Sequence, residues 1–192
     1  MSNTAKIIIV LTLITMISGG ILALLDNYTK PRIEAHKVEV KNAAVDEVLP
    51  PNDRVEKIEK GEYQFYVAYK GNDIIAIAFK AFGGGFQSKL VLMVGITPDF
   101  TKITSVKMLE QVETPGLGTK IEYDPANKEN PAWFTDQFKN LKTQPEITYI
   151  KNVKPTKNTE IQAITGATIS SKAVVVILNE HIAKAKAAWE SN

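Results

Sequence analysis

The sequence of 192 residues predicts an α+β fold, with one N-terminal transmembrane helix followed by a domain that has a largely antiparallel sheet and flanking helices. Three observations predict it. A charge-free apolar run opens the chain, short alternating segments separated by turn residues follow, and a long amphipathic segment ends the chain. Apolar residues make up 44% and charged residues 23% of the chain, as in an ordinary folded domain with a buried core.

The apolar run covers residues 7–25 and reads IIIVLTLITMISGGILALL. As a helix it spans roughly 28 Å, close to the hydrocarbon thickness of a bilayer, about 30 Å. A cleaved signal peptide usually has a shorter apolar core that ends at a small-x-small site, whereas Asp26-Asn27-Tyr28 follows here. We therefore expect a retained anchor over residues 1–30 and a separate domain over 31–192.

The first element expected after the anchor is a second helix that starts near Pro31, because proline is well tolerated in the first turn of a helix. Apolar residues recur near helical spacing up to Pro50-Pro51, at Ile33, Val40, Ala44 and Val48.

Four strands are expected next, over residues 63–69, 74–79, 89–96 and 103–109. In the first of them Tyr63, Phe65, Val67 and Tyr69 share one face. Turn residues separate the strands at 71–73 and 98–99. Residues 119–131 read as loop, 132–141 as a short helix and 147–150 as one more strand.

A terminal helix is expected from Ser170 to the end of the chain. Its apolar positions recur at helical spacing, at Val174, Ile177, Leu178, Ile182, Ala185 and Trp189. Trp133 and Phe134, in the preceding short helix, are expected to pack in the core.

Composition excludes several classes of function. The absence of cysteine excludes disulfides, thiolate catalysis and iron–sulfur ligation, and the net charge of +2 gives no reason to expect nucleic acid. Only two histidines occur, so an imidazole-rich metal site is not expected. His181 is expected at the surface or boundary of the terminal helix. No catalytic residue is predicted.

The clearest local motif is Thr165-Gly166-Ala167-Thr168-Ile169-Ser170-Ser171, just before the terminal helix. Small residues around Thr168 leave room for another molecule to approach. Ser170 or Ser171 is expected to cap the helix, whose first N–H groups can bind an anion such as a phosphate. The alternative is an ordinary capped helix start, preceded by a turn.

A second motif is Glu113-Thr114-Pro115-Gly116-Leu117-Gly118, in which Pro-Gly indicates a type II turn. Its glycines expose main-chain N–H groups and would let a flat ring lie against the backbone. Taken alone, it would be a tight turn after a strand. The triplet Gly83-Gly84-Gly85 reads as a link between strands.

The order GGG…VGIT…ETPGLG…TGATISS resembles the FMN-binding domain of the G subunit of the Rnf electron-transport complex. It also resembles the related C subunit of sodium-pumping NADH:quinone oxidoreductase. The likeness covers nearly the whole chain, and its length favours the Rnf subunit.

The resemblance implies an FMN joined through its phosphate to Thr168 by a separate flavin transferase that uses FAD as donor. Main-chain groups of Gly116–Thr119 and the Thr114 side chain would face the ring, with Glu113 near its polar edge. Thr165, Ser170 and Ser171 would bind the phosphate. The remaining implied cofactor-binding residues are Gly166, Ala167, Ile169, Leu117 and Gly118. Gln162 stands where the family motif usually has Asp.

On this reading the chain is a redox subunit, with no substrate turnover of its own, in a membrane complex that couples electron transfer between ferredoxin and NAD to sodium or proton transport. Its partners would be the other membrane subunits and the flavin transferase. The resemblance also implies a single-pass protein of the cell membrane with its flavin domain outside the cytoplasm. Counting Lys30, Arg32 and Lys37 after the span against Lys6 before it slightly favours the opposite orientation.

Two other hypotheses stay open on the sequence alone. One is the quinone-reductase C subunit or a stand-alone flavinylated membrane reductase. The other is a cofactor-free, membrane-anchored sensor or adhesion domain.

Overall fold

The computed structural model describes residues 2–191 and divides the chain into two compact units, with the boundary between residues 40 and 41. The first unit lies in α1 (Asn3–Val48), a single helix of 46 residues that contains an 18-residue window of mean hydropathy 2.6, none of it buried. This helix is long and apolar enough to cross a membrane. The expectation that a new helix starts near Pro31 is wrong, because α1 continues through that residue. Proline removes one backbone hydrogen bond, and the turns on either side keep theirs.

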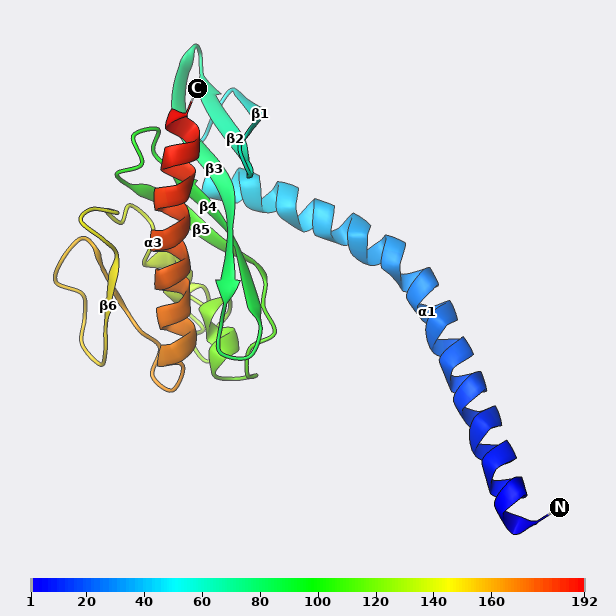
Figure 1. Ribbon diagram of the computed structural model, residues 1–192. Helices are drawn as coiled ribbons and strands as arrows, with labels where there is room; N and C mark the ends of the chain where they lie inside the picture. The colour runs from blue at the N-terminus through cyan, green and yellow to red at the C-terminus, as the bar shows by residue number, and fades with distance from the viewer. Residues whose placement is uncertain (1, 192) are drawn as a thin grey trace. The chain divides into compact units, whose positions relative to one another are not determined.

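The second unit is built on a five-stranded antiparallel sheet with the order β1-β2-β3-β4-β5 (Figure 1). The four expected strands are confirmed. The strands are β1 (Arg54–Lys60), β2 (Tyr63–Lys70), β3 (Asp73–Gly84), β4 (Lys89–Ile96) and β5 (Ile103–Glu110).

Strand β1 was missed because its sequence, RVEKIEK, is mostly charged and mostly exposed. It pairs with β2 alone and so forms an edge of the sheet. Charged side chains are typical of edge strands, where they discourage pairing with another chain.

One face of the sheet carries the main core and is covered by α3 (Thr168–Glu190), which runs along it (Figure 1). The expected inward face of β2 is confirmed, since Tyr63, Phe65 and Val67 are buried there. Gly83 lets α3 approach closely, because a Cβ at that position would lie 2.5 Å from Cγ1 of Ile177.

The far end of α3 is tied to the edge of the sheet. Lys60 of β1 donates a hydrogen bond of 2.9 Å to the carbonyl of Trp189, and its Nζ lies 5.1 Å from the centroid of the Trp189 ring. The helix is therefore held to the sheet at Gly83 and again near its last turn.

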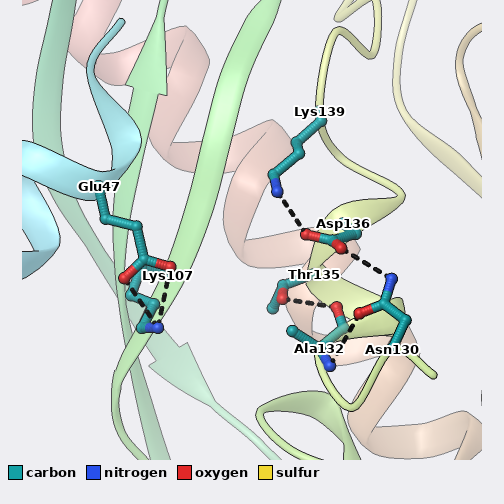
Figure 2. Close-up of polar contacts among 7 residues, drawn as sticks. All are labelled: Glu47, Lys107, Asn130, Ala132, Thr135, Asp136 and Lys139. Atoms are coloured by element: carbon teal, nitrogen blue, oxygen red, sulfur yellow. Dashed lines mark hydrogen bonds and ion pairs between the residues drawn. The ribbon is translucent and has the colours of Figure 1, made fainter. Parts of the chain in front are cut away.

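The opposite face of the sheet packs against the last turns of α1. Ala44, Val45 and Val48 form a smaller cluster with four sheet residues, Ala68, Ala76, Ala78 and Met93. Figure 2 shows an ion pair at the same place, in which both carboxylate oxygens of Glu47 lie 2.9–3.0 Å from Nζ of Lys107 on β5.

Between β5 and α3 the chain forms short elements, namely η1 (Gly118–Ile121), α2 (Trp133–Asp136), β6 (Thr148–Ile150) and β7 (Glu160–Gln162). The expected strand at 147–150 is confirmed as β6. Its parallel pairing with β7 was not expected.

The short helix expected over 132–141 has only the four residues of α2. Side-chain hydrogen bonds determine the chain path here (Figure 2): Asn130 accepts from the N–H of Ala132 and donates to Asp136, and Thr135 donates to the carbonyl of Ala132. Asn140 then has a φ of 62°, which a right-handed helix does not allow.

His181 was expected at a surface or boundary position and is instead buried, with 7% of its surface exposed. The Tyr63 hydroxyl lies 2.8 Å from its Nδ1, and Nε2 lies 2.8 Å from the carbonyl oxygen of Phe82. That carbonyl lies beyond the paired residues of the β2–β3 ladder and takes its hydrogen bond from α3 instead. Burial, followed by the negative charges of Glu62 and Glu180, raises the pKa of Tyr63 to about 12.

Candidate functional site

Three segments far apart in sequence meet at the first turn of α3 and enclose a cavity of about 260 Å³. They are the loop between β3 and β4, the ETPGLG turn after β5, and the TGATISS motif. The cavity is lined by Phe86, Thr114, Leu117, Gly118, Gly166, Ala167, Thr168, Ile169 and Ser170.

The turn at residues 114–117 has the conformation that its sequence predicts. The N–H of Leu117 donates to the carbonyl of Thr114 at 3.1 Å, and Gly116 has a φ of 73°. These are the features of a type II turn with glycine at its third position. The Thr119 hydroxyl accepts a hydrogen bond of 3.1 Å from the N–H of Gly116 and so stabilises the turn.

Helix α3 begins at Thr168, with Ala167 as its N-cap residue and no side chain capping it. The expectation that Ser170 or Ser171 caps the helix is therefore wrong. Both serines lie inside the first turn and are buried. The Ser171 hydroxyl donates to the Ala167 carbonyl and accepts from the N–H of Ile164, each at 3.0 Å, so it holds the turn before the helix.

The hydroxyls of the TGATISS motif differ sharply in their partners. Ser170 and Ser171 are engaged inside the domain, and Thr165 is exposed with Oδ1 of Asn152 at 3.4 Å. Thr168 is partly buried and lines the cavity, and among residues 2–191 its hydroxyl has no hydrogen-bond partner. It is the hydroxyl of this motif best placed to react with, or bind, a molecule in the cavity.

Gly166 opens the cavity beside Thr168. Its φ of 83° lies in the left-handed region that favours glycine, and a Cβ there would lie 3.2 Å from Cδ2 of Leu117. The turn before the helix therefore needs both the conformational freedom and the small size of glycine.

Glu113 lies outside the cavity lining and hydrogen-bonds to segments that form the cavity. It is 2% exposed, and its carboxylate accepts the Ser170 hydroxyl at 2.5 Å. It also accepts backbone N–H groups of the β3–β4 loop, from Phe86 at 3.2 Å, Gln87 at 3.0 Å and Ser88 at 3.2 Å. Burial by itself raises the pKa of the Glu113 carboxyl, but these hydrogen bonds, that of Ser170 foremost, outweigh burial and hold its pKa below the usual value.

Two glycines make room for this carboxylate. A Cβ on Gly85 would lie 2.5 Å from Oε1 of Glu113. A Cβ on Gly118 would lie 2.7 Å from Cβ of Glu113 and 3.0 Å from the Ser170 hydroxyl. The glycines of all three motifs therefore have packing roles around one site.

The structure brings most of the expected site residues to the cavity, but not all of them. Five expected residues lie outside its lining: Glu113, Gly116, Thr119, Thr165 and Ser171. Phe86 lines the cavity and was missed, although a large aromatic residue directly after three glycines at a hairpin tip was a signal that could have found it.

The cavity suits a nucleotide with a flat ring. The first N–H groups of a long helix lack partners within the helix and attract a phosphate, and here they lie beside Thr168. An apolar rim formed by Phe86, Leu117 and Ile169 is 57%, 46% and 59% exposed, respectively, and offers surface to a ring. The residues present therefore fit an FMN group.

Comparison with known proteins gives the same result. The FMN-binding domain family matches residues 85–183. The G subunit of the proton-translocating ferredoxin:NAD(+) oxidoreductase complex of Clostridium ljungdahlii is 35% identical over 90% of this chain and 86% of that protein. The G subunit of the Na(+)-translocating ferredoxin:NAD(+) oxidoreductase complex of Acetobacterium woodii is 30% identical over 92% and 89%, respectively.

Two solved structures share the fold. NqrC of Shewanella oneidensis has a TM-score of 0.53 at 19% identity, over 62% of this chain and 55% of that chain. The C subunit of the Na(+)-translocating NADH-quinone reductase of Parabacteroides distasonis has a TM-score of 0.53 at 24% identity, over 68% and 64%, respectively. The chain thus spans less than two thirds of either solved chain, and the likeness concerns the fold alone.

The matched range of the FMN-binding domain, 85–183, includes every residue that lines the cavity at the start of α3. The chain belongs to the FMN-binding domain family, and within it to the G subunits of ion-translocating oxidoreductase complexes.

Proposed function

We propose that this chain carries an FMN covalently bound through its phosphate to Thr168 and relays electrons within a membrane complex that couples ferredoxin:NAD oxidoreduction to ion transport. The single observation that carries the proposal is the Thr168 hydroxyl, which lines the cavity and has no partner among the described residues. The other hydroxyls of the motif are hydrogen-bonded or exposed.

The start of α3 supports a phosphate at this residue. Thr168 is the first residue of a helix of 23 residues, so its side chain lies beside N–H groups that have no acceptor within the helix. These groups and the helix dipole would stabilise the negative charge of a phosphodiester. No cationic side chain lines the cavity, so the backbone would supply most of this stabilisation.

The attachment step conserves atoms and electrons. The Thr168 oxygen bonds to the flavin-side phosphorus of FAD, the P–O bond to the bridging oxygen breaks, and AMP leaves. The hydroxyl proton is released, and nothing is oxidised or reduced. The chain has no base beside Thr168 among the cavity-lining residues, which fits catalysis by a separate flavin transferase.

Bound FMN supplies the ability to accept and donate one or two electrons, and the protein supplies its position and surroundings. Thr114, Leu117, Gly118 and Phe86 line the cavity and would contact the ring. Because α1 is long and apolar enough to span a bilayer, we further propose that residues 1–30 anchor the chain. The helix itself gives no orientation, and the proposal that the flavin domain lies outside the cytoplasm rests on the family resemblance alone.

The test is to express the full chain in membranes with a flavin transferase and view a denaturing gel under ultraviolet light. We expect a fluorescent band near 21 kDa that is lost in Thr168→Ala and retained in Thr168→Ser, which keeps the hydroxyl. Thr148→Ala, at a partly buried threonine in β6, is the matched control and should stay fluorescent. A dark wild-type band, or flavin retained by Thr168→Ala, would refute the proposal.

Association with the other subunits needs its own measurement. The flavinylated chain should copurify with further membrane subunits that reduce or oxidise it. Purification of a flavinylated chain alone, active as a reductase, would favour the stand-alone alternative.

A further inference from the structure

We propose that Glu113 is the positioning residue for flavin attachment: its buried carboxylate fixes the first turn of α3 against the β3–β4 loop and so holds the Thr168 hydroxyl open to the cavity. This inference rests on the proposed function. In this role Glu113 holds the segments that form the cavity, instead of contacting the polar edge of the ring.

Glu113 connects the first turn of α3 with the β3–β4 loop. Its Oε2 accepts the Ser170 hydroxyl, two residues beyond Thr168 in the same helical turn. The same oxygen accepts the N–H of Phe86, a residue of the β3–β4 loop that also lines the cavity. One carboxylate therefore connects the helix turn that carries Thr168 with the loop that faces it.

The hydrogen-bond donors around Glu113 match an ionised carboxylate. Oε1 accepts the N–H groups of Gln87 and Ser88, so both oxygens receive donors. Glutamine at this position has one oxygen and one NH₂ group. Whichever way its amide lies, a backbone N–H of the loop faces the NH₂ group and loses its acceptor.

The residues around Glu113 leave its side chain no room to move. Gly85 and Gly118 lie so close to Glu113 that neither has space for a methyl group. The carboxylate cannot shift to make up for a lost hydrogen bond, so the segments on either side must move instead. Movement of the α3 turn would displace Thr168, whose hydroxyl has to meet a phosphorus atom held by another protein.

The test measures attachment of flavin from FAD to the full-length, unloaded chain by a flavin transferase. In Glu113→Gln we expect kcat for attachment to fall on the order of tenfold to a hundredfold, as misplaced reacting atoms do, with KM for the chain nearly unchanged. Asp124→Asn is the matched control. Asp124 is also buried and accepts hydrogen bonds, from Trp133 and Ala126, but it lies outside the cavity, so its kcat should stay at the wild-type value even where its melting temperature falls.

A second variant keeps the proposal testable if Glu113→Gln does not fold. Ser170→Ala removes the hydroxyl that links Glu113 to α3 and leaves the loop contacts in place. Ser170→Ala should also lower kcat. In a chain that already carries Glu113→Gln, it should lower kcat by less than about a further twofold, because both substitutions break the same hydrogen bond.

Failure of this inference can be told apart from failure of the proposed function. A wild-type chain that takes no flavin would refute the function. A wild-type chain that takes flavin, together with an unchanged kcat in Glu113→Gln or in Ser170→Ala, would overturn the positioning role alone. The positioning role would also be overturned if Asp124→Asn lowered kcat as much as Glu113→Gln does, with an equal fall in melting temperature.

Discussion

Gly118→Ala tests whether the glycines of the ETPGLG turn are there for packing. The added methyl group would lie 2.7 Å from Cβ of Glu113 and 3.0 Å from both Oε2 of Glu113 and the Ser170 hydroxyl. All three atoms belong to buried side chains joined by a hydrogen bond. The domain must either accept the overpacking, which costs about 1–3 kcal/mol, or lose a hydrogen bond to a charged group, which costs about 1.5–3 kcal/mol.

We therefore expect the free energy of unfolding to fall by about 2–3 kcal/mol, which in a domain of this size lowers the melting temperature by about 4–12 °C. The assay is thermal unfolding of the full chain in detergent, followed by the near-ultraviolet circular dichroism of Trp133 and Trp189. Flavin attachment should also slow, since the same atoms hold the first turn of α3.

Two glycine variants serve as controls. Gly84 has open space around it and no positive φ, so Gly84→Ala should change stability by less than about 0.5 kcal/mol. Gly116 also has open space but a φ of 73°, so Gly116→Ala should destabilise by about 1–2 kcal/mol through backbone strain alone. A Gly118→Ala chain as stable as Gly84→Ala would refute the packing argument.

Three further predictions concern charge and burial. The fold holds the pKa of Glu113 below its usual value, so the ionised carboxylate stabilises the domain fully above about pH 4.3, and this stabilisation is lost as pH falls through the folded-state pKa. The difference in free energy of unfolding between wild type and Glu113→Gln, measured in urea, should therefore become smaller toward acid pH. A difference that stays constant with pH would contradict this. Tyr63 should ionise near pH 12, later than an ordinary tyrosine, and spectrophotometric titration of Tyr63→Phe should lack this late step. Lys107→Met should destabilise by less than about 1 kcal/mol because the Lys107–Glu47 pair is exposed to solvent; a loss above about 2 kcal/mol in chemical unfolding would show that the end of α1 depends on it.

Much of the fold could be predicted because its strands bury one face. Alternation in β2 and the apolar run of β4 indicate strands whatever surrounds them, and the apolar stripe of α3 indicates a helix. The turn at Pro115-Gly116 was also predictable, since its conformation depends on two adjacent residues.

The remainder depended on contacts between distant segments. Strand β1 has little apolar pattern and is held mainly by its ladder with β2. His181 is buried because Tyr63 and Phe82, each about a hundred residues earlier, offer partners to both ring nitrogens. The hydrogen-bond partners of Glu113, Ser170 and Phe86, lie 57 and 27 residues away from it in the chain. A single sequence does not display such pairings.

The way α3 is fastened has a consequence for electron transfer. Gly83 lets the middle of the helix press against β3, His181 bonds to the same strand, and Lys60 holds the last turn to β1. A flavin attached at Thr168 would lie at one end of a helix that is held to the sheet at its middle and at its last turn. Its attachment point would keep a fixed position within the domain, so any large displacement of that point would carry the whole domain with it.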